Sequence, residues 1–277
     1  MSAAKLFFFD LDGTLLNSEK KITPATYAAL EAWHAAGYFM AISSGRPMVS
    51  ITQVIRELNL EGFSPYAVAF NGCYIRRYGE ETPLLKYTVS IEDMMLVARE
   101  AAGLGLYVHY YDDTHIVTPL DGRELQFYTR VVKLPYRVSS PLTDGIEKES
   151  CKMICIDLDT TGRQALLADK IREKTGGRLC CLMSNPWYME IFPSQAGKGA
   201  ALTALAEILN IGIENTFAAG DEQNDISMLK AAGCGIAPAN ATAEVKAAAD
   251  IVCELDNDHD AFAGFILTHC QTGDVSI

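Results

Sequence analysis

Short apolar segments that alternate with amphipathic helical segments are the feature that most constrains how this chain can fold. A first strand is predicted at residues 5–10, a helix from Thr23-Pro24 to Gly37, and further strands at residues 38–43 and 66–70. Apolar runs of this kind are typical of strands that are buried on both faces. Their alternation with helices predicts an α/β fold, a Rossmann-like parallel sheet with helices on both faces.

The middle of the chain has a different pattern of residues. Tyr and charged residues interleave there with Val and Ile, as in Tyr107–Thr118. This pattern is typical of antiparallel strands with one half-exposed face. The alternation of apolar strands and helices returns from Lys198 onward. We therefore expect a core domain made of residues 1–83 and 187–277, interrupted by an inserted α+β domain at residues 84–186.

The charge of the chain limits its partners. It contains 35 acidic and 23 basic residues, a net charge of −12, whereas a general nucleic-acid surface needs an excess of Lys and Arg. No apolar run reaches the length of a membrane span, and Met1–Lys5 lacks the pattern of an export signal. The eight cysteines include no Cys-x-x-Cys pair, which makes zinc a poor interpretation and fits thiols in a reducing compartment. We expect a cytoplasmic protein with no nucleic-acid or membrane partner.

Two carboxylates follow the first predicted strand in the run Asp10-Leu11-Asp12-Gly13-Thr14. Alternation along a strand predicts that the side chains of Asp10 and Asp12 point to the same side. Open α/β sheets place ligands at the carboxyl ends of their strands, and Gly13 allows a sharp turn there. The run alone leaves open a catalytic pair or a plain turn. A calcium loop would need a later glutamate, which is missing.

Three further segments carry polar groups at the ends of predicted elements. Ser43-Ser44-Gly45-Arg46-Pro47 offers a hydroxyl and backbone N–H groups at a helix start, which suits either anion binding or helix capping. Lys198 opens a helix, where a cation is unfavourable unless an anion lies nearby; a solvated lysine is the alternative. Asp221 ends another apolar strand, and Asp225 can face the same cation if a helix begins between them. Oxygen ligands of this kind suit Mg²⁺.

Taken together and in this order, these segments resemble the motifs of the haloacid dehalogenase superfamily. The matching residues are Asp10-x-Asp12-Gly13-Thr14, Ser44-Gly45-Arg46, Lys198 and Gly220-Asp221-x-x-Asn224-Asp225. Phe70-Asn71-Gly72 and Glu190-Ile191-x-Pro193 resemble, more narrowly, the Cof-type phosphatases, which carry a type-IIB cap inserted after the third strand. The motifs are spread over essentially the whole chain. Ser44 departs from the threonine that is frequent at its position, but the hydroxyl is kept.

The resemblance implies a Mg²⁺-dependent phosphatase that acts on small phosphorylated metabolites, with sugar phosphates favoured, through an aspartyl-phosphate on Asp10. Asp12 would be the acid–base residue, and the inserted domain would be a cap that selects the substrate. The resemblance assigns phosphate binding to Ser44, Gly45, Lys198 and Asn224, substrate contact to Arg46 and Asn71, and the metal to Asp10, the backbone carbonyl of Asp12, Asp221 and, through water, Asp225. Asn224 would orient either Lys198 or the phosphate.

Breaking an ester bond to an alcohol at neutral pH needs a proton donor, so Asp12 must carry a proton when substrate binds. Burial or the charge of Asp10 is expected to raise its pKa for this purpose. A sugar phosphomutase with the same cap is an alternative, although such enzymes carry a different phosphate loop. A phospho-accepting regulatory module is another, although such modules lack a long insertion.

Two features of the inserted segment remain ambiguous from sequence. Tyr107, His109 and Tyr111 share one face of a strand, where they line a substrate pocket or cover the inserted domain's own core. Asp157-Leu158-Asp159 imitates the first motif but lacks the glycine, and we interpret it as the end of a strand followed by capping residues. The oligomeric state is left open by the sequence.

Overall fold

The computed structural model describes residues 3–112, 114–130 and 132–271. The chain forms two compact units, one made of Met1–Leu85 with Gly197–Ile277 and the other of Lys86–Ala196. The second unit is thus an insertion into the first. The boundary expected at residue 186 is too early, because the strand that follows it pairs within the sheet of the inserted unit.

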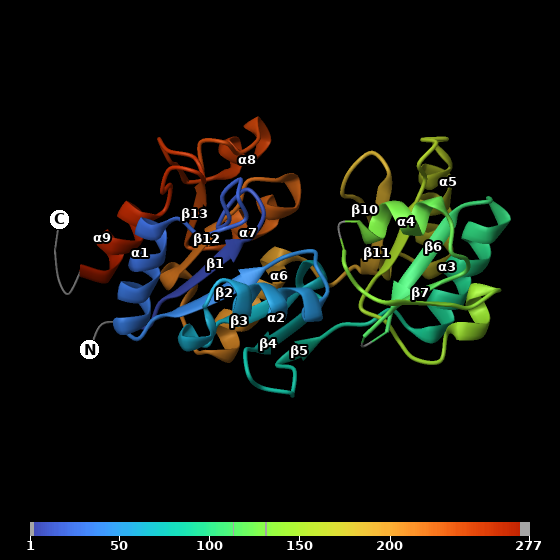
Figure 1. Cartoon of the computed structure of the whole chain (residues 1–277), viewed down its shortest axis with the longest axis horizontal. Helices are drawn as coiled ribbons and strands as arrows, with labels where there is room; N and C mark the ends of the chain where they lie inside the picture. Colours follow the sequence, from blue (N-terminus) through green and yellow to red (C-terminus); the bar gives the residue numbers. More distant parts are fainter. Residues whose placement is uncertain (1–2, 113, 131, 272–277) are drawn as a thin grey trace. The chain divides into compact units, whose positions relative to one another are not determined.

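Within the described residues, an eight-stranded sheet forms the centre of the first unit (Figure 1). Its strands are β1 (Leu6–Asp10), β2 (Phe39–Ser43), β3 (Tyr66–Ala69), β4 (Tyr74–Arg77), β5 (Leu85–Lys86), β12 (Thr216–Ala219), β13 (Cys234–Ala237) and β14 (Ile251–Val252). They lie in the order β14-β13-β12-β1-β2-β3-β4-β5. The pairs from β14 to β3 are parallel, and β4 runs antiparallel to β3.

Helices cover both faces of this sheet. They are α1 (Pro24–Ala35), α2 (Met48–Glu57), α6 (Lys198–Ile208), α7 (Ile226–Ala231), α8 (Ala243–Ala248) and α9 (Ala263–Gln271). The strand β1 is buried along its whole length, and its side chains alternate between two cores. Leu6 and Phe8 pack with residues of α6, α7 and α8, whereas the ring of Phe7 lies 5.7 Å from Trp33 of α1 and 6.0 Å from Phe265 of α9. The expected Rossmann-like α/β core is confirmed.

The inserted unit contains a second sheet, of six strands in the part of the chain that the structure describes. Its strands are β6 (Tyr107–Tyr111), β7 (Ile116–Thr118), β8 (Tyr136–Val138), β9 (Met153–Ile156), β10 (Leu179–Met183) and β11 (Tyr188–Pro193), and its helices are α3 (Ile91–Gly103), α4 (Arg123–Thr129) and α5 (Arg163–Thr175). The order is β10-β11-β9-β6-β7-β8, antiparallel apart from the β7–β8 pair. Val97 of α3 and Ile171 of α5 belong to the core cluster that covers one face of this sheet. The expected α+β insertion is therefore present.

Side chains form local hydrogen bonds with nearby groups of the chain at two places in the inserted unit. The hydroxyl of Ser90 accepts a hydrogen bond from the N–H of Asp93 and caps α3. The imitation motif follows the end of β9 as a turn, in which the carboxylate of Asp157 accepts hydrogen bonds from the N–H and the hydroxyl of Thr161. The expected capping by its side chains is wrong, because the N-cap of α5 is Gly162. Among the described residues, no helix is long and apolar enough to cross a membrane.

Candidate active site

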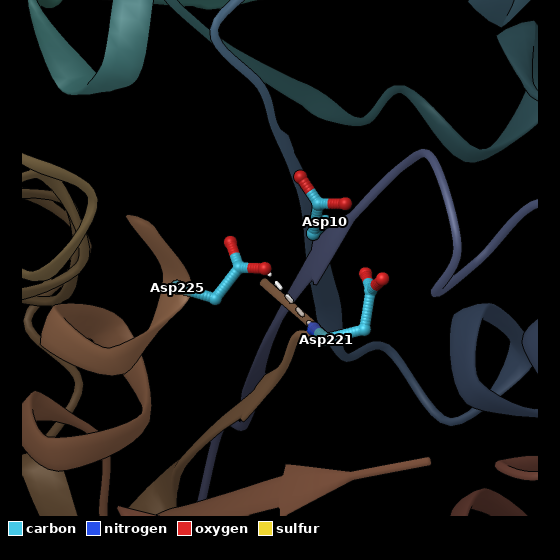
Figure 2. A group of neighbouring side chains, drawn as sticks. All are labelled: Asp10, Asp221 and Asp225. Atoms are coloured by element: carbon cyan, nitrogen blue, oxygen red, sulfur yellow. Dashed lines mark hydrogen bonds between the residues drawn. The ribbon is translucent and has the colours of Figure 1, made fainter. Parts of the chain in front are cut away.

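Three buried carboxylates gather where two neighbouring parallel strands end (Figure 2). Asp10 is the last residue of β1, Asp221 follows β12, and Asp225 ends the short 3-10 helix Gln223–Asp225. Each residue contributes an oxygen atom, and these atoms all lie within 4.8 Å of one another. The strands bring them together because β1 and β12 pair in register, with Phe9 opposite Ala219.

The two acids after β12 are joined by the start of a helix. The Oδ2 atom of Asp225 accepts hydrogen bonds of 3.0 Å from the backbone N–H groups of Asp221 and Glu222. These bonds satisfy amides that have no partner inside a helix. The sequence-based expectation that a helix begins between Asp221 and Asp225 and turns both toward one site is confirmed.

Lys198 is the first residue of α6, and its side chain is only 1% exposed. Its Nζ atom donates to Oδ1 of Asp10 at 2.6 Å and to Oδ1 of Asp225 at 2.5 Å. The next residue, Gly199, allows this approach, because a Cβ atom there would lie 2.3 Å from the carbonyl oxygen of Ser227. A lysine at the start of a helix predicted a nearby anion, and in the structure two carboxylates, those of Asp10 and Asp225, fill that role.

Three carboxylates face one ammonium group, so two negative charges remain in excess when all are ionised. Burial, reinforced by the charge of Asp225, raises the pKa of Asp10 to about 8. Burial also raises the pKa of Asp221 to about 6, against the hydrogen bond from Thr14. Although burial acts to lower the pKa of Lys198, the charges of Asp10 and Asp225 raise it above its ordinary value. The carboxyl groups of Asp10 and Asp221 therefore resist ionisation until positive charge is added.

The donor set fits a divalent cation. In the described part of the chain, Oδ2 of Asp10 and Oδ2 of Asp221 accept no hydrogen bond, while the other oxygen of each is engaged. Both oxygens of Asp225 are already bonded to Lys198 and to backbone amides. These two oxygens without a hydrogen bond, and the two excess negative charges, suit Mg²⁺. This ion takes one or two carboxylates together with water and phosphate.

Asp12 does not share the environment of Asp10. Its carboxylate is bound at both oxygens by the guanidinium of Arg46, with Nη2–Oδ2 at 2.7 Å, and by Nζ of Lys20 at 2.9 Å. Burial acts to raise the pKa of Asp12, but the hydrogen bonds and charges of Lys20 and Arg46 outweigh it, and the pKa is lowered. The expected rise in the pKa of Asp12 is therefore wrong for this arrangement. The argument that strand alternation points the side chains of Asp10 and Asp12 to the same side also fails. The strand β1 ends at Asp10, and a turn follows.

Four of the residues predicted to bind phosphate or substrate, Ser44, Gly45, Arg46 and Asn71, lie beyond the ends of β2 and β3. Ser43 pairs with Asp10, so Ser44 lies directly beyond that pair. The hydroxyl of Ser44 accepts from the N–H of Arg46 at 3.3 Å, and its carbonyl accepts from the N–H of Asn71 at 3.1 Å. A Cβ atom on Gly45 would lie 2.9 Å from Oδ1 of Asn71. Ser44, Gly45 and Asn71 are thus packed against one another.

Asn224 was expected to orient Lys198 or the phosphate. Within the described residues its side chain makes no hydrogen bond to Lys198. The neighbouring Asp225 holds Lys198 instead, because its position at the end of the 3-10 helix turns its side chain inward. Asp225 thus orients Lys198 in this structure, and the role of Asn224 toward the phosphate stays a prediction.

Two residues of the first motif have partners that sequence reasoning missed. The hydroxyl of Thr14 donates to Oδ1 of Asp221 at 2.6 Å. Gly13 has a φ of +85°, and a Cβ atom there would lie 2.3 Å from Oδ2 of Asp221. Both contacts join segments far apart in the chain, so no local pattern could have shown them.

Tyr107, His109 and Tyr111 are all buried on the face of β6 opposite the core cluster. The ring of His109 lies between those of the two tyrosines and 4.7 Å from Tyr128 of α4. Burial, together with the charge of Lys152, lowers the pKa of His109 to about 3, so its ring is neutral. Neither of its ring nitrogens has a hydrogen-bond partner among the described residues.

Comparison with known proteins agrees with this geometry. The family described as haloacid dehalogenase-like hydrolase matches residues 7–266. The pyridoxal phosphate phosphatase of Escherichia coli is 31% identical, over 96% of this chain and 98% of its own length. A haloacid dehalogenase-like hydrolase of Bacteroides thetaiotaomicron has a solved structure with a TM-score of 0.85 and 28% identity, over 96% and 99% of the two chains. A solved sugar phosphatase of haloacid dehalogenase subclass IIB shares the fold, with a TM-score of 0.78 and 23% identity over 96% and 99%.

The chain therefore belongs to the haloacid dehalogenase-like hydrolases, and it shares the fold of the solved subclass IIB sugar phosphatase. Within that family it is a phosphatase, an enzyme that hydrolyses phosphoric monoesters.

Gly13→Ala tests the contact between the first motif and Asp221. The new methyl group would displace the Asp221 carboxylate, and a shift of about 1 Å at such a site lowers kcat by about 100-fold. Gly79→Ala is the matched control, because Gly79 has a φ of +83° and nothing within 4 Å of the Cβ position. It should cost about 1–2 kcal/mol of stability through backbone strain alone and leave kcat unchanged. Equal kcat losses in the two variants, measured beside urea unfolding, would contradict the steric argument.

Proposed function

We propose that this enzyme is a Mg²⁺-dependent phosphatase that hydrolyses small phosphate monoesters through an aspartyl-phosphate on Asp10. The observation that carries the proposal is the buried cluster of Asp10, Asp221 and Asp225 around Lys198, which lacks two positive charges. A nucleophile, a cation site and a fixed ammonium group in one place are what phosphoryl transfer requires.

The reaction has two displacements. In the first, a carboxylate oxygen of Asp10 forms a bond to phosphorus, the ester P–O bond breaks, and Asp12 gives its proton to the departing alkoxide. In the second, Asp12 takes a proton from water as that water attacks phosphorus, and the bond to Asp10 breaks. Asp10, Asp221 and the backbone carbonyl of Asp12 would hold Mg²⁺, with Asp225 acting through water. When bound, the cation supplies positive charge beside the phosphoryl oxygens.

Asp12 can carry a proton only after its two cationic partners have been released. Lys20 and Arg46 are also the groups that an anionic substrate would attract, so we propose that substrate binding draws Arg46 away from Asp12. Ser44, the N–H of Gly45 and Lys198 would hold the transferring phosphoryl group, where charge must be stabilised. Asn224 and Asn71 would contact the bound substrate at the edge of the same site.

The substrate is proposed to be a sugar phosphate, in keeping with the motif pattern of the chain. Pyridoxal phosphate is the main rival, because it is the substrate in the name of the E. coli relative. A panel of phosphate monoesters with Mg²⁺ decides between them by kcat/KM and release of inorganic phosphate. Transfer of phosphate to a second hydroxyl of the sugar without release would instead indicate a phosphomutase.

We also propose that the enzyme acts in the cytoplasm, where such metabolites are found.

Removal of the metal should stop turnover, because the excess negative charge at the site would repel the substrate phosphate. Chelation should abolish activity, Mg²⁺ should restore it, and Ca²⁺ should inhibit through its looser coordination. Mg²⁺ should also raise the melting temperature by binding the folded state. Asp221→Asn should weaken that rise, whereas Asp169→Asn, at a position 71% exposed, should not. Full turnover in excess chelator would refute the metal assignment.

Asp12→Asn tests the proton donor. An alkoxide needs a proton to leave, whereas nitrophenolate does not, so phosphorylation of Asp10 should slow far more with a sugar phosphate than with nitrophenyl phosphate. Because the intermediate still needs a base, nitrophenyl phosphate should give a burst of nitrophenol followed by slow turnover. Asp10→Asn should give neither. Equal losses for both esters in pre-steady-state measurements, without trapped phosphoenzyme, would make Asp12 a structural residue.

We also propose that the inserted unit selects the organic part of the substrate. His109→Phe keeps the ring contacts and removes two nitrogens that lack partners in the described chain, so the melting temperature should not fall. The kcat/KM for the preferred ester relative to methyl phosphate should change by about 10-fold or more. His34→Phe, on the exposed side of α1 in the first unit, is the control and should leave this ratio unchanged. An unchanged ratio in His109→Phe would remove His109 from substrate selection.

A further inference from the structure

The loop after β1 carries Asp12, yet much of its backbone is held from the far end of the chain. The amide nitrogen of Asn240 donates to the carbonyl oxygen of Gly13 at 2.8 Å. The amide nitrogen of Asn257 donates to the carbonyl oxygen of Leu16 at 2.7 Å. These are neutral side-chain amides directed at backbone carbonyls, which is a geometry that fixes the path of a loop.

The two asparagines act as a connected pair. The side-chain oxygen of Asn240 accepts a hydrogen bond of 3.1 Å from the backbone N–H of Asn257. This bond determines which end of the Asn240 amide faces Gly13, because only the nitrogen end can donate to a carbonyl. A second link joins the same segments, since the carboxylate of Asp258 accepts from the N–H and the hydroxyl of Ser18.

The segment that contains Asn240 also reaches the other half of the catalytic cluster. Thr242, the N-cap of α8, donates its backbone N–H to the carbonyl oxygen of Asp221 at 3.1 Å. A single residue, Ala241, therefore separates the residue that contacts the Asp12 loop from the residue that contacts Asp221. Thr14, next to Gly13, is in turn bonded to Asp221. The loop between β13 and α8 thus connects both sides of the site.

We infer that Asn240 is a positioning residue for catalysis, which sets the place of the Asp12 loop relative to Asp221 through the carbonyl of Gly13. It contacts neither the proposed nucleophile nor the carboxylate oxygens of the metal site. Its exposure means that the fold does not depend on its burial, so its hydrogen bond to Gly13 can be removed without opening a cavity. The inference rests on the proposed phosphatase function.

Asn240→Asp is the sharpest test, because the substitution is isosteric and keeps the acceptor for Asn257 but places a carboxylate oxygen against the Gly13 carbonyl. Asn240→Ala removes the donor without adding charge. Both variants should lower kcat by about 10-fold or more, with KM and melting temperature little changed. Because the displaced loop carries Asp12, the loss should be greater with a sugar phosphate than with nitrophenyl phosphate. Asn215→Asp, which adds the same charge at the end of the short 3-10 helix Ile213–Asn215 of the same unit, should leave kcat unchanged for both esters.

The outcomes separate the inference from the function on which it rests. If the unsubstituted enzyme releases no phosphate from any ester with Mg²⁺, the proposed function is wrong. If it does, and the Asn240 variants keep kcat and the ratio between the two esters, the inference is wrong. A loss in Asn240→Asp that is absent from Asn240→Ala would assign the effect to charge and also overturn it. Equal losses with both esters would reduce Asn240 to general support of the fold.

Discussion

The contact of Lys198 with Asp10 and Asp225 is the interaction on which the site depends. A fully buried ammonium group is tolerated only where anions compensate it, and three buried carboxylates are tolerated only where cations do. Lys198 neutralises one of the three negative charges, and in the proposed function a divalent ion supplies the remaining positive charge. Burial, together with the charge of the neighbouring carboxylates, raises the pKa values of Asp10 and Asp221. The excess of negative over positive charge at this site therefore affects both its stability and its chemistry.

Two features of the backbone bring these charges together. Parallel pairing of β1 with β12 and β2 places the ends of three strands at one edge of the sheet, which is where α/β sheets bind ligands. Close approach at Gly199 then brings the start of α6 against the segment after Asp225. Neither feature involves a strained side chain of the site, so the pairing of the strands and the packing of α6 preorganise the cluster.

Much of this could be predicted from sequence, and the failures have physical reasons. Short buried strands and their following helices were placed correctly because hydrophobic periodicity and capping residues act locally. Asp10, Lys198, Asp221 and Asp225 could be grouped because each lies near the end of a strand or the start of a helix, and the structure brings their side chains together. The partner of Asp12 was missed because strand alternation stops at Asp10 and Arg46 lies on another strand's loop. The end of the insertion was missed because β11 pairs with β9 and β10, a choice that no local pattern records.

The insertion also has a consequence for how the enzyme is made. The pairing of β1 with β12 joins Phe9 to Ala219, so the centre of the sheet cannot close while only the amino-terminal half has been synthesised. A growing chain would expose the apolar edge of β1 until the whole inserted unit and β12 had followed it from the ribosome. Such long-range closure is slow compared with local pairing. The inserted unit, continuous in sequence, can complete its own sheet first, so Asp10, the proposed nucleophile, lacks its neighbours Asp221 and Asp225 until the last third of the chain has been synthesised.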